Sequence, residues 1–199
     1  MQQATERRSN RERTESTRAA LTDAARALFI EKTYAETGTP EIVAAAGVTR
    51  GALYHHFADK QALLRAVIEA ESETVAREID AASIDSPSPR DALIDGGKAF
   101  LTAMSQPGRT RLLLLDGPAV LGRTAMDEID ARYGNRTLRE GLAASMRAGA
   151  IRRLPLDALT TMLGAAFDRA ALAIENGAAR TDCETVLTAF IDGLGSRES

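Results

Sequence analysis

The apolar and polar residues of this chain follow the period of a helix. Between residues 16 and 34, apolar side chains recur at intervals of three and four positions, the spacing of one face of an amphipathic helix. A second such face runs from residue 59 to residue 80. The two-residue alternation of a half-buried strand is missing from the sequence. The pattern therefore predicts an all-α fold.

Proline, glycine and serine mark the breaks between the predicted helices. The clearest break is SIDSPSP at 83–89, because two prolines and three serines do not continue a helix. We expect about nine helices, at residues 16–34, 40–46, 50–57, 59–80, 90–105, 109–116, 123–148, 156–176 and 181–195. The predicted organisation is a flexible basic arm at 1–15, a three-helix domain at 16–60 and a helical bundle at 61–199.

The composition excludes several classes of protein. A hydrophobic content of 44% is that of a folded domain and rules out a disordered or collagen-like chain. Cys183 is the only cysteine, so an intramolecular disulfide and a thiolate metal cage are excluded. The start of the chain lacks the apolar core of a secretory signal, and no apolar run approaches the roughly 20 residues of a membrane span. We expect a cytoplasmic protein with no membrane partner.

The net charge of −3 is unevenly distributed. Residues 1–60 carry 9 basic and 8 acidic side chains, whereas the remainder carries 16 and 20. Lys and Arg drive nucleic-acid binding by displacing counterions from phosphates. Two interpretations of the N-terminal arm stay open, contact with nucleic acid or a soluble tail whose glutamates offset its positive charge. The arginines concerned are Arg7, Arg8, Arg11, Arg13 and Arg18.

The segment TPEIVAAAGVTRGALYHHFADK at 39–60 has the pattern of two short helices joined by a tight turn. Thr39 is predicted as an N-cap, followed by Pro at the first helical position and an acid. Gly47 closes this helix and Thr49 caps the next. Small residues before the turn let the helices approach closely, as in a helix-turn-helix. In that motif the second helix enters the major groove of DNA, with its N-terminal residues against base edges.

Catalytic and metal-binding chemistry find no support in the sequence. His55 and His56 point about 100° apart on a helix, so they do not face one metal ion. No Walker phosphate loop is present, no GxGxxG follows a strand, and Cys183 has no nearby His to activate it. We predict no enzymatic activity, no cofactor and no metal site. An acidic cluster is interpreted as a solvated face, and it comprises Asp116, Asp127, Glu128 and Asp130.

The motif GVTRGALYHHF at 47–57, followed by Asp59, Lys60 and Leu63, resembles the DNA-binding signature of the tetracycline-repressor (TetR) family of one-component regulators. The likeness covers about a quarter of the chain, from the first helix to the start of the fourth. Members of this family are homodimers whose small N-terminal domain binds palindromic operators, while a larger helical domain holds an effector pocket and the dimer interface. The resemblance implies a DNA-binding transcriptional regulator, and specifically a ligand-responsive repressor.

The resemblance also implies which residues contact double-stranded DNA. Matching positions give base-edge or groove contacts to Thr49, Arg50 and His55, an apolar contact to Ala52, and backbone contacts to Thr39, Tyr54, His56 and Lys60. A guanidinium such as that of Arg50 bonds guanine O6 and N7 together, although a phosphate contact is the alternative. Gly51 has no side chain, so either the DNA groove approaches its backbone closely or a DNA contact is missing at this position.

The last two predicted helices carry apolar faces wider than one chain's bundle needs. We predict a homodimer through these helices, the alternative being a buried helix pair within one chain. A two-fold axis there would let two recognition helices reach half-sites about 34 to 36 Å apart. The predicted interface residues are Leu159, Leu163, Phe167, Ile174, Leu187, Phe190 and Leu194.

The middle helices contain the candidates for an effector pocket. Adaptable Met side chains and a Tyr hydroxyl suit a small apolar effector, although each of these residues also suits a simple core. The pair Gly96-Gly97 either leaves room for a ligand or marks a kink. The predicted pocket residues are Phe100, Met104, Met126, Ile129, Tyr133 and Met146.

Two rival functions stay open at this point. One is an all-α ligand-binding or enzymatic bundle that uses its helix-turn-helix for packing. The other is an activator or architectural DNA-binding protein without an effector.

Overall fold

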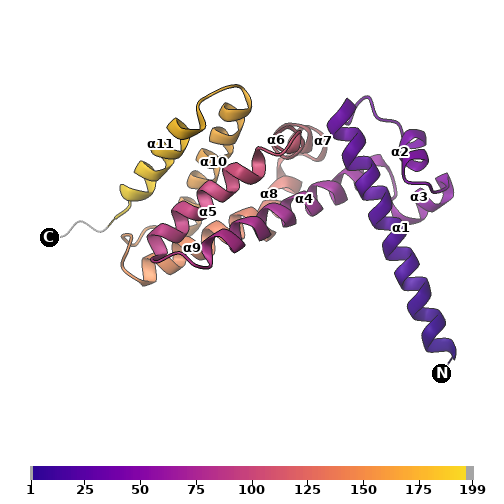
Figure 1. Ribbon diagram of the computed structural model, residues 1–199, viewed down its shortest axis with the longest axis horizontal. Coiled ribbons are helices and arrows are strands. Elements are labelled where there is room, and N and C mark those ends of the chain that lie inside the picture. Colours follow the sequence, from indigo (N-terminus) through magenta and orange to yellow (C-terminus); the bar gives the residue numbers. More distant parts are fainter. Residues whose placement is uncertain (1, 196–199) are drawn as a thin grey trace.

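A computed structural model describes residues 2–195, with side chains from residue 12 onward. Figure 1 shows a small N-terminal unit, from which one long helix projects, and a larger helical bundle. The N-terminal unit contains α1 (Gln2–Lys32), α2 (Thr39–Ala45) and α3 (Arg50–His56), and α4 (Lys60–Ser83) runs from it into the bundle. The bundle continues with α5 (Pro89–Met104), α6 (Arg109–Arg111), the π-helical turn η1 (Leu112–Asp116), α7 (Gly117–Leu121), α8 (Arg123–Arg132), α9 (Gly134–Arg147), α10 (Leu156–Glu175) and α11 (Arg180–Asp192).

The predicted all-α fold is confirmed. In residues 2–195, extended pairing is limited to one isolated antiparallel bridge between Ile151 and Gly195. None of the helices in this range is long and apolar enough to cross a membrane.

The apolar face predicted for the first helix forms the core of the N-terminal unit. Leu21, Ala25 and Phe29 of α1 are fully buried, together with Ile42 of α2 and Leu53 of α3. Burying a Leu, Ile or Phe side chain stabilises a fold by about 1.5 to 3 kcal/mol. The long helix α1 and the two short helices α2 and α3 are thereby held together by a few large side chains, which fixes the direction of α3.

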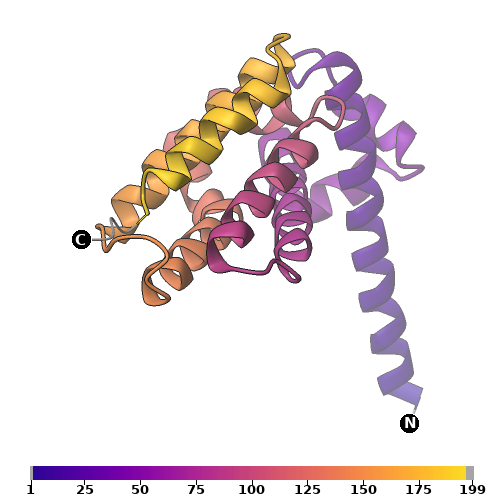
Figure 2. The ribbon, with the colours of Figure 1, turned by 60° about the vertical axis from the view of Figure 1, so that its left-hand side comes forward.

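Helix α1 starts earlier than predicted. The boundary expected between a flexible arm and a helix at residue 16 is absent, because the helix begins at Gln2. Residues 1–32 contain neither Gly nor Pro, so nothing in the backbone chemistry stops the helix within the arm. The side chains of Arg7, Arg8 and Arg11 lie outside the described residues. The helix projects from the N-terminal unit in both ribbon views (Figures 1 and 2).

The helix predicted over 123–148 is interrupted. Tyr133 takes φ −122° and ψ −94°, outside the helical region, and separates α8 from α9. The following residue, Gly134, loses more conformational freedom in a helix than other residues, which makes this position a weak point of a continuous helix. The interruption brings the start of α9 against α10, where Asn135 packs on the backbone of Gly164.

Candidate nucleic-acid interface and ligand cavity

The turn between α2 and α3 is built as the sequence predicts. Gly47 has φ +66°, a left-handed conformation that glycine adopts without strain. Its amide donates to the carbonyl of Ala44, and the amide of Val48 donates to that of Val43. These bonds satisfy the last carbonyls of α2 and turn the chain sharply. A helix-turn-helix results, with α3 as its second helix.

The start of α3 is exposed and capped. Thr49 Oγ1 accepts a hydrogen bond from the Ala52 amide at 3.2 Å, which confirms the predicted N-cap. Leu53 faces the core, whereas Arg50, Tyr54 and His55 are exposed. This one-sided burial directs the polar face of α3 away from the protein, and α3 lies at the edge of the N-terminal unit in Figure 1.

Three of the residues predicted to contact DNA meet on one surface. The Arg50 guanidinium lies 5.5 Å from the centroid of the Tyr54 ring. Hydrogen bonds from Thr39 and then Arg50 lower the pKa of the Tyr54 hydroxyl. The prediction placed the N-cap of α2 at Thr39, but the structure has Gly38 there. The Thr39 hydroxyl is therefore available to Tyr54. Residues of both α2 and α3 therefore form this surface.

His56 lies on the side of α3 that faces α1. It is half-buried, and burial lowers the pKa of its imidazole, as do the neighbouring charges of His55 and Arg18. Arg18 Nη1 donates to the His56 carbonyl at 3.3 Å, and its guanidinium lies 4.4 Å from the centroid of the Phe57 ring. Phe57 is buried, in agreement with its predicted core role. Arg18 is thereby placed beside α3, a position that the sequence did not indicate.

Lys60 is oriented differently from the prediction. Instead of pointing outward to grip the DNA backbone, its Nζ donates to the carbonyls of Tyr34 and Thr37 at 2.9 and 3.0 Å. Nζ also lies 4.1 Å from the centroid of the Tyr34 ring. The ammonium group thus holds the α1–α2 loop against the start of α4.

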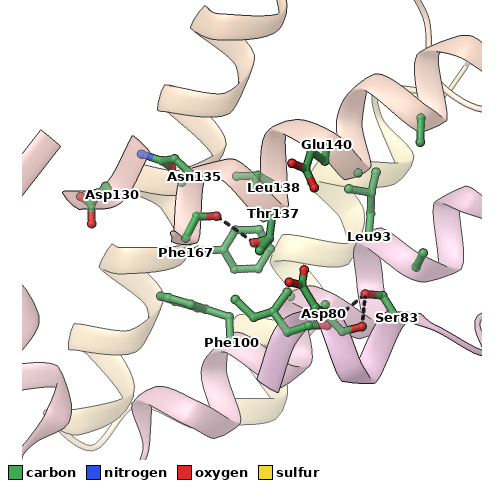
Figure 3. A pocket seen from close by; sticks show the side chains of 18 of the residues that line it. Asp80, Ser83, Leu93, Phe100, Asp130, Asn135, Thr137, Leu138, Glu140 and Phe167 are labelled. Carbon is green, nitrogen blue, oxygen red and sulfur yellow. Dashed lines mark hydrogen bonds between the residues drawn. The ribbon is translucent and has the colours of Figure 1, made fainter. Parts of the chain in front are cut away.

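The bundle contains a cavity of about 370 Å³, within the usual range for small-ligand sites. Figure 3 shows its side chains converging from α4, α5, α8, α9 and α10. Its lining combines apolar, small and acidic residues: Ile79, Asp80, Ser83, Ala92, Leu93, Gly96, Gly97, Phe100, Asp130, Gly134, Asn135, Thr137, Leu138, Glu140, Gly141, Ala144, Gly164, Phe167 and Asp168.

The cavity differs from the predicted pocket in most of its residues. Phe100 and the pair Gly96-Gly97 line it as expected. The other predicted pocket residues do not: Met104, Met126 and Ile129 are buried core, and Tyr133 and Met146 are half-buried elsewhere. The predicted residues did not include a stripe of small residues on one face of α9, spaced three and four positions apart, which leaves space for the cavity. This stripe consists of Gly134, Thr137, Gly141 and Ala144.

Helices α10 and α11 present an apolar groove on the outside of the bundle, and the two helices lie side by side in Figure 2. Three predicted interface residues line this groove as exposed or half-buried side chains: Leu159, Phe190 and Leu194. Leu163 forms its floor, with 5% of its surface exposed. Phe167 and Leu187 differ from the prediction, because they face the chain's own core, and Ile174 is half-buried outside the groove. Met162 and Val186, which belong to the apolar faces of these helices, are also exposed.

Comparison with known proteins settles the family. Residues 21–67 match the family model described as bacterial regulatory proteins, tetR family. Residues 90–194, more than half of the chain, match the tetracyclin repressor-like C-terminal domain. The chain belongs to the TetR family. As a member, it is a DNA-binding transcriptional regulator with a helix-turn-helix, as the sequence predicts.

Individual TetR-like proteins agree with this assignment. The A-factor receptor protein of Streptomyces griseus is 35% identical over 92 residues, which are 46% of this chain and 31% of that protein. The HTH-type transcriptional regulator TtgR of Pseudomonas putida is 39% identical over 67 residues, 34% of this chain and 32% of that protein. The chain thus matches about a third of the length of these relatives. The crystal structure of a TetR-family transcriptional regulator from Pectobacterium atrosepticum is 28% identical with a TM-score of 0.77, covering 95% of this chain and 99% of that one.

Proposed function

We propose that this TetR-family protein is a repressor that binds a palindromic operator as a homodimer and leaves it when a small ligand fills the bundle cavity. The observation that carries the proposal is the exposed, capped α3, whose Arg50 and Tyr54 are held next to Thr39 of α2. A helix presented in this way suits the major groove, with Arg50 against base edges. The proposed DNA-contact set is Thr39, Thr49, Arg50, Ala52, Tyr54, His55 and His56.

The proposed dimer uses the groove of α10 and α11. Met162 and Phe190 expose 76% and 52% of their surfaces there, and exposed apolar patches of this kind mark association sites. A two-fold axis at this groove would pair two copies of α3 for the two halves of an operator. Since operators are chromosomal, the protein would act in the cytoplasm, without an enzymatic step.

Helix α4 supports a link between ligand and DNA. Its C-terminal half supplies Ile79, Asp80 and Ser83 to the cavity, while its N-terminal residue Lys60 bonds the loop beside α2. A ligand that displaces α4 would move the N-terminal unit and change the distance between the two copies of α3. By linkage, such a ligand binds the released state better, and DNA weakens ligand binding by the same factor. The A-factor receptor protein, a relative over 92 residues, is by its name a receptor, which agrees with this type of response.

Selection of duplexes from a random library by the full chain tests the proposal. The expected product is an inverted repeat with half-sites about one helical turn apart, bound more weakly as salt rises because phosphate contacts release counterions. Enrichment of a single half-site would contradict the dimer, and no enrichment would contradict sequence-specific binding. A mobility-shift assay on the selected duplex, repeated with ligands found by thermal shift, then tests the switch.

A further inference from the structure

The cavity in the bundle is apolar but carries negative charge. None of the described residues that line it is Lys, Arg or His, whereas four are carboxylates. Two of these share one ion-pair partner, because Arg136 donates to Asp80 at 3.1 Å and to Glu140 at 3.0 Å. The side-chain carboxyls of the other two, Asp130 and Asp168, make no hydrogen bond or ion pair within the described part of the chain.

The charge of Asp130 acts on Asp168. Burial and then the nearby Asp130 raise the pKa of Asp168 to about 7, although Arg123 opposes the rise. Burial raises the pKa of Asp130 to about 6, with Asp127 adding to the rise and Arg123 opposing it. Two carboxyls that line the same cavity therefore have no ion-pair partner within the described residues, and Arg123 offsets their charge only in part. Desolvated carboxylates of this kind gain most from a positive group placed between them.

Aromatic rings lie on the same wall. The rings of Phe100 and Phe167 pack edge to face, with centroids 5.9 Å apart and an angle of 73° between their planes. Figure 3 shows both rings in the cavity, with Asp130 and Asn135 beyond them. Phe167 precedes Asp168 in α10, so a ring and an unpaired carboxyl come from adjacent positions. A cation is attracted to aromatic faces as well as to carboxylates.

We propose that the ligand of this cavity is a small organic cation, with its apolar part against Phe100 and Phe167 and its ammonium group beside Asp130 and Asp168. The inference rests on the proposed ligand-responsive function and specifies its ligand. A volume of about 370 Å³ lies at the small end of ligand sites, which favours a molecule of one or two rings. An anion would find four carboxylates and no cationic side chain in the described lining, and a neutral ligand would leave the half-buried Asp130 and Asp168 without a partner.

Isothermal titration of the full chain with three probes of equal shape tests the charge preference. The probes are benzyltrimethylammonium, its neutral carbon analogue neopentylbenzene, and the anion benzylsulfonate. We expect the cation to bind at least tenfold more tightly than the neutral analogue at pH 8, and the anion not to bind. At pH 6.5 cation binding should release protons, visible as a binding enthalpy that depends on the buffer. Asp130→Asn and Asp168→Asn should each lose most of the preference, whereas Glu175→Gln, which removes an exposed charge from the same helix, should keep it.

Either of two binding results would overturn the inference in the unmodified chain: equal or tighter binding of the neutral or anionic probe, or no binding of the cation. Preference retained in both Asn variants would also overturn it. A separate mobility-shift assay distinguishes this failure from failure of the proposed function. If the cation binds but the protein stays on its operator, the ligand class stands and the switch is wrong. If the neutral probe binds and releases the protein from DNA, the ligand-dependent release is supported and the inference that the ligand is a cation is wrong.

Discussion

Glu71 of α4 and Arg109 of α6 form a buried ion pair, with 2.7 Å between Nε and Oε2 and less than a tenth of either side chain exposed. Arg26 of α1 donates to the other oxygen of Glu71 at 2.6 Å. Burial raises the pKa of Glu71, but the hydrogen bonds from Arg26 and Arg109 outweigh it and lower the pKa overall. One carboxylate therefore connects the N-terminal unit, the long helix α4 and the bundle.

Replacing Glu71 should destabilise the whole protein. Glu71→Gln leaves the buried Arg109 with only the more distant, partly exposed Glu78 at 3.6 Å as a counter-charge. Removing one partner of a buried pair costs about 3 to 5 kcal/mol. Urea unfolding measures the loss. Because the folded-state pKa of Glu71 is lowered, the stability it contributes is present above the unfolded pKa of about 4.3 and is lost as pH falls below it. The exposed pair of Arg65 and Glu128 gives the control, since Glu128→Gln should cost at most about 1 kcal/mol. Equal losses for both variants would contradict the central role of Glu71.

Arg50→Ala should relax base preference. Losing a bidentate contact to guanine costs about 1 to 3 kcal/mol of discrimination at one position of each half-site. Competition assays with single-base variants of the selected operator measure this. Arg153→Ala removes an equal charge from an exposed position far along the chain and should leave discrimination unchanged. If Arg50→Ala instead weakens all duplexes alike and only flattens the salt dependence, Arg50 holds a phosphate.

Lys60→Met should destabilise the N-terminal unit. The substitution removes the donor for the carbonyls of Tyr34 and Thr37, and hydrogen bonds to charged groups contribute about 1.5 to 3 kcal/mol. Thermal and urea unfolding should show a loss of that order. Lys98→Met, at an exposed lysine of α5, should be neutral. Unchanged stability together with uniformly weaker DNA binding would show that Lys60 grips phosphates after all.

Asp168→Asn should stabilise the protein at high pH. The pKa of Asp168 is raised to about 7 from 3.8, so the folded state keeps a proton that the unfolded state loses. Stability from this group is therefore present below pH 4 and declines as pH rises toward 7. At pH 8 the variant should gain on the order of 2 kcal/mol, or about 4 to 8 °C in Tm. Little difference is expected at pH 4. A gain that is independent of pH would contradict the ionisation argument.

Phe190→Asp should dissociate the proposed dimer. A charge in the apolar groove of α10 and α11 must be desolvated on association, which strongly disfavours the interface. Sedimentation velocity should show monomers, and operator affinity should fall by at least tenfold because each half-site is then bound alone. Ile84→Asp is the control, since Ile84 is an exposed apolar residue after α4 and lies outside the groove. If the dimer persists in Phe190→Asp but dissociates in Ile84→Asp, the interface does not lie in the groove of α10 and α11.

The helix-turn-helix could be predicted from the sequence because its determinants are local. Thr49 bonds an amide three residues ahead, and Gly47 supplies its own left-handed turn, so spacing alone identifies both. The buried faces of Leu21, Ala25 and Phe29 follow from helical periodicity in the same way.

Only the tertiary structure decided where the chain is hollow and where its charges meet. Met126 and Ile129 fill the core instead of a pocket, while Asp130 next to them faces the cavity; neighbouring helices, not residue type, determine this difference. The inward orientation of Lys60 likewise depends on two carbonyls more than twenty residues away. The helix-turn-helix is therefore determined by short-range hydrogen bonds that can be recognised in the sequence. The cavity and its unpaired carboxyls arise from long-range packing, which the periodicity of the sequence does not encode.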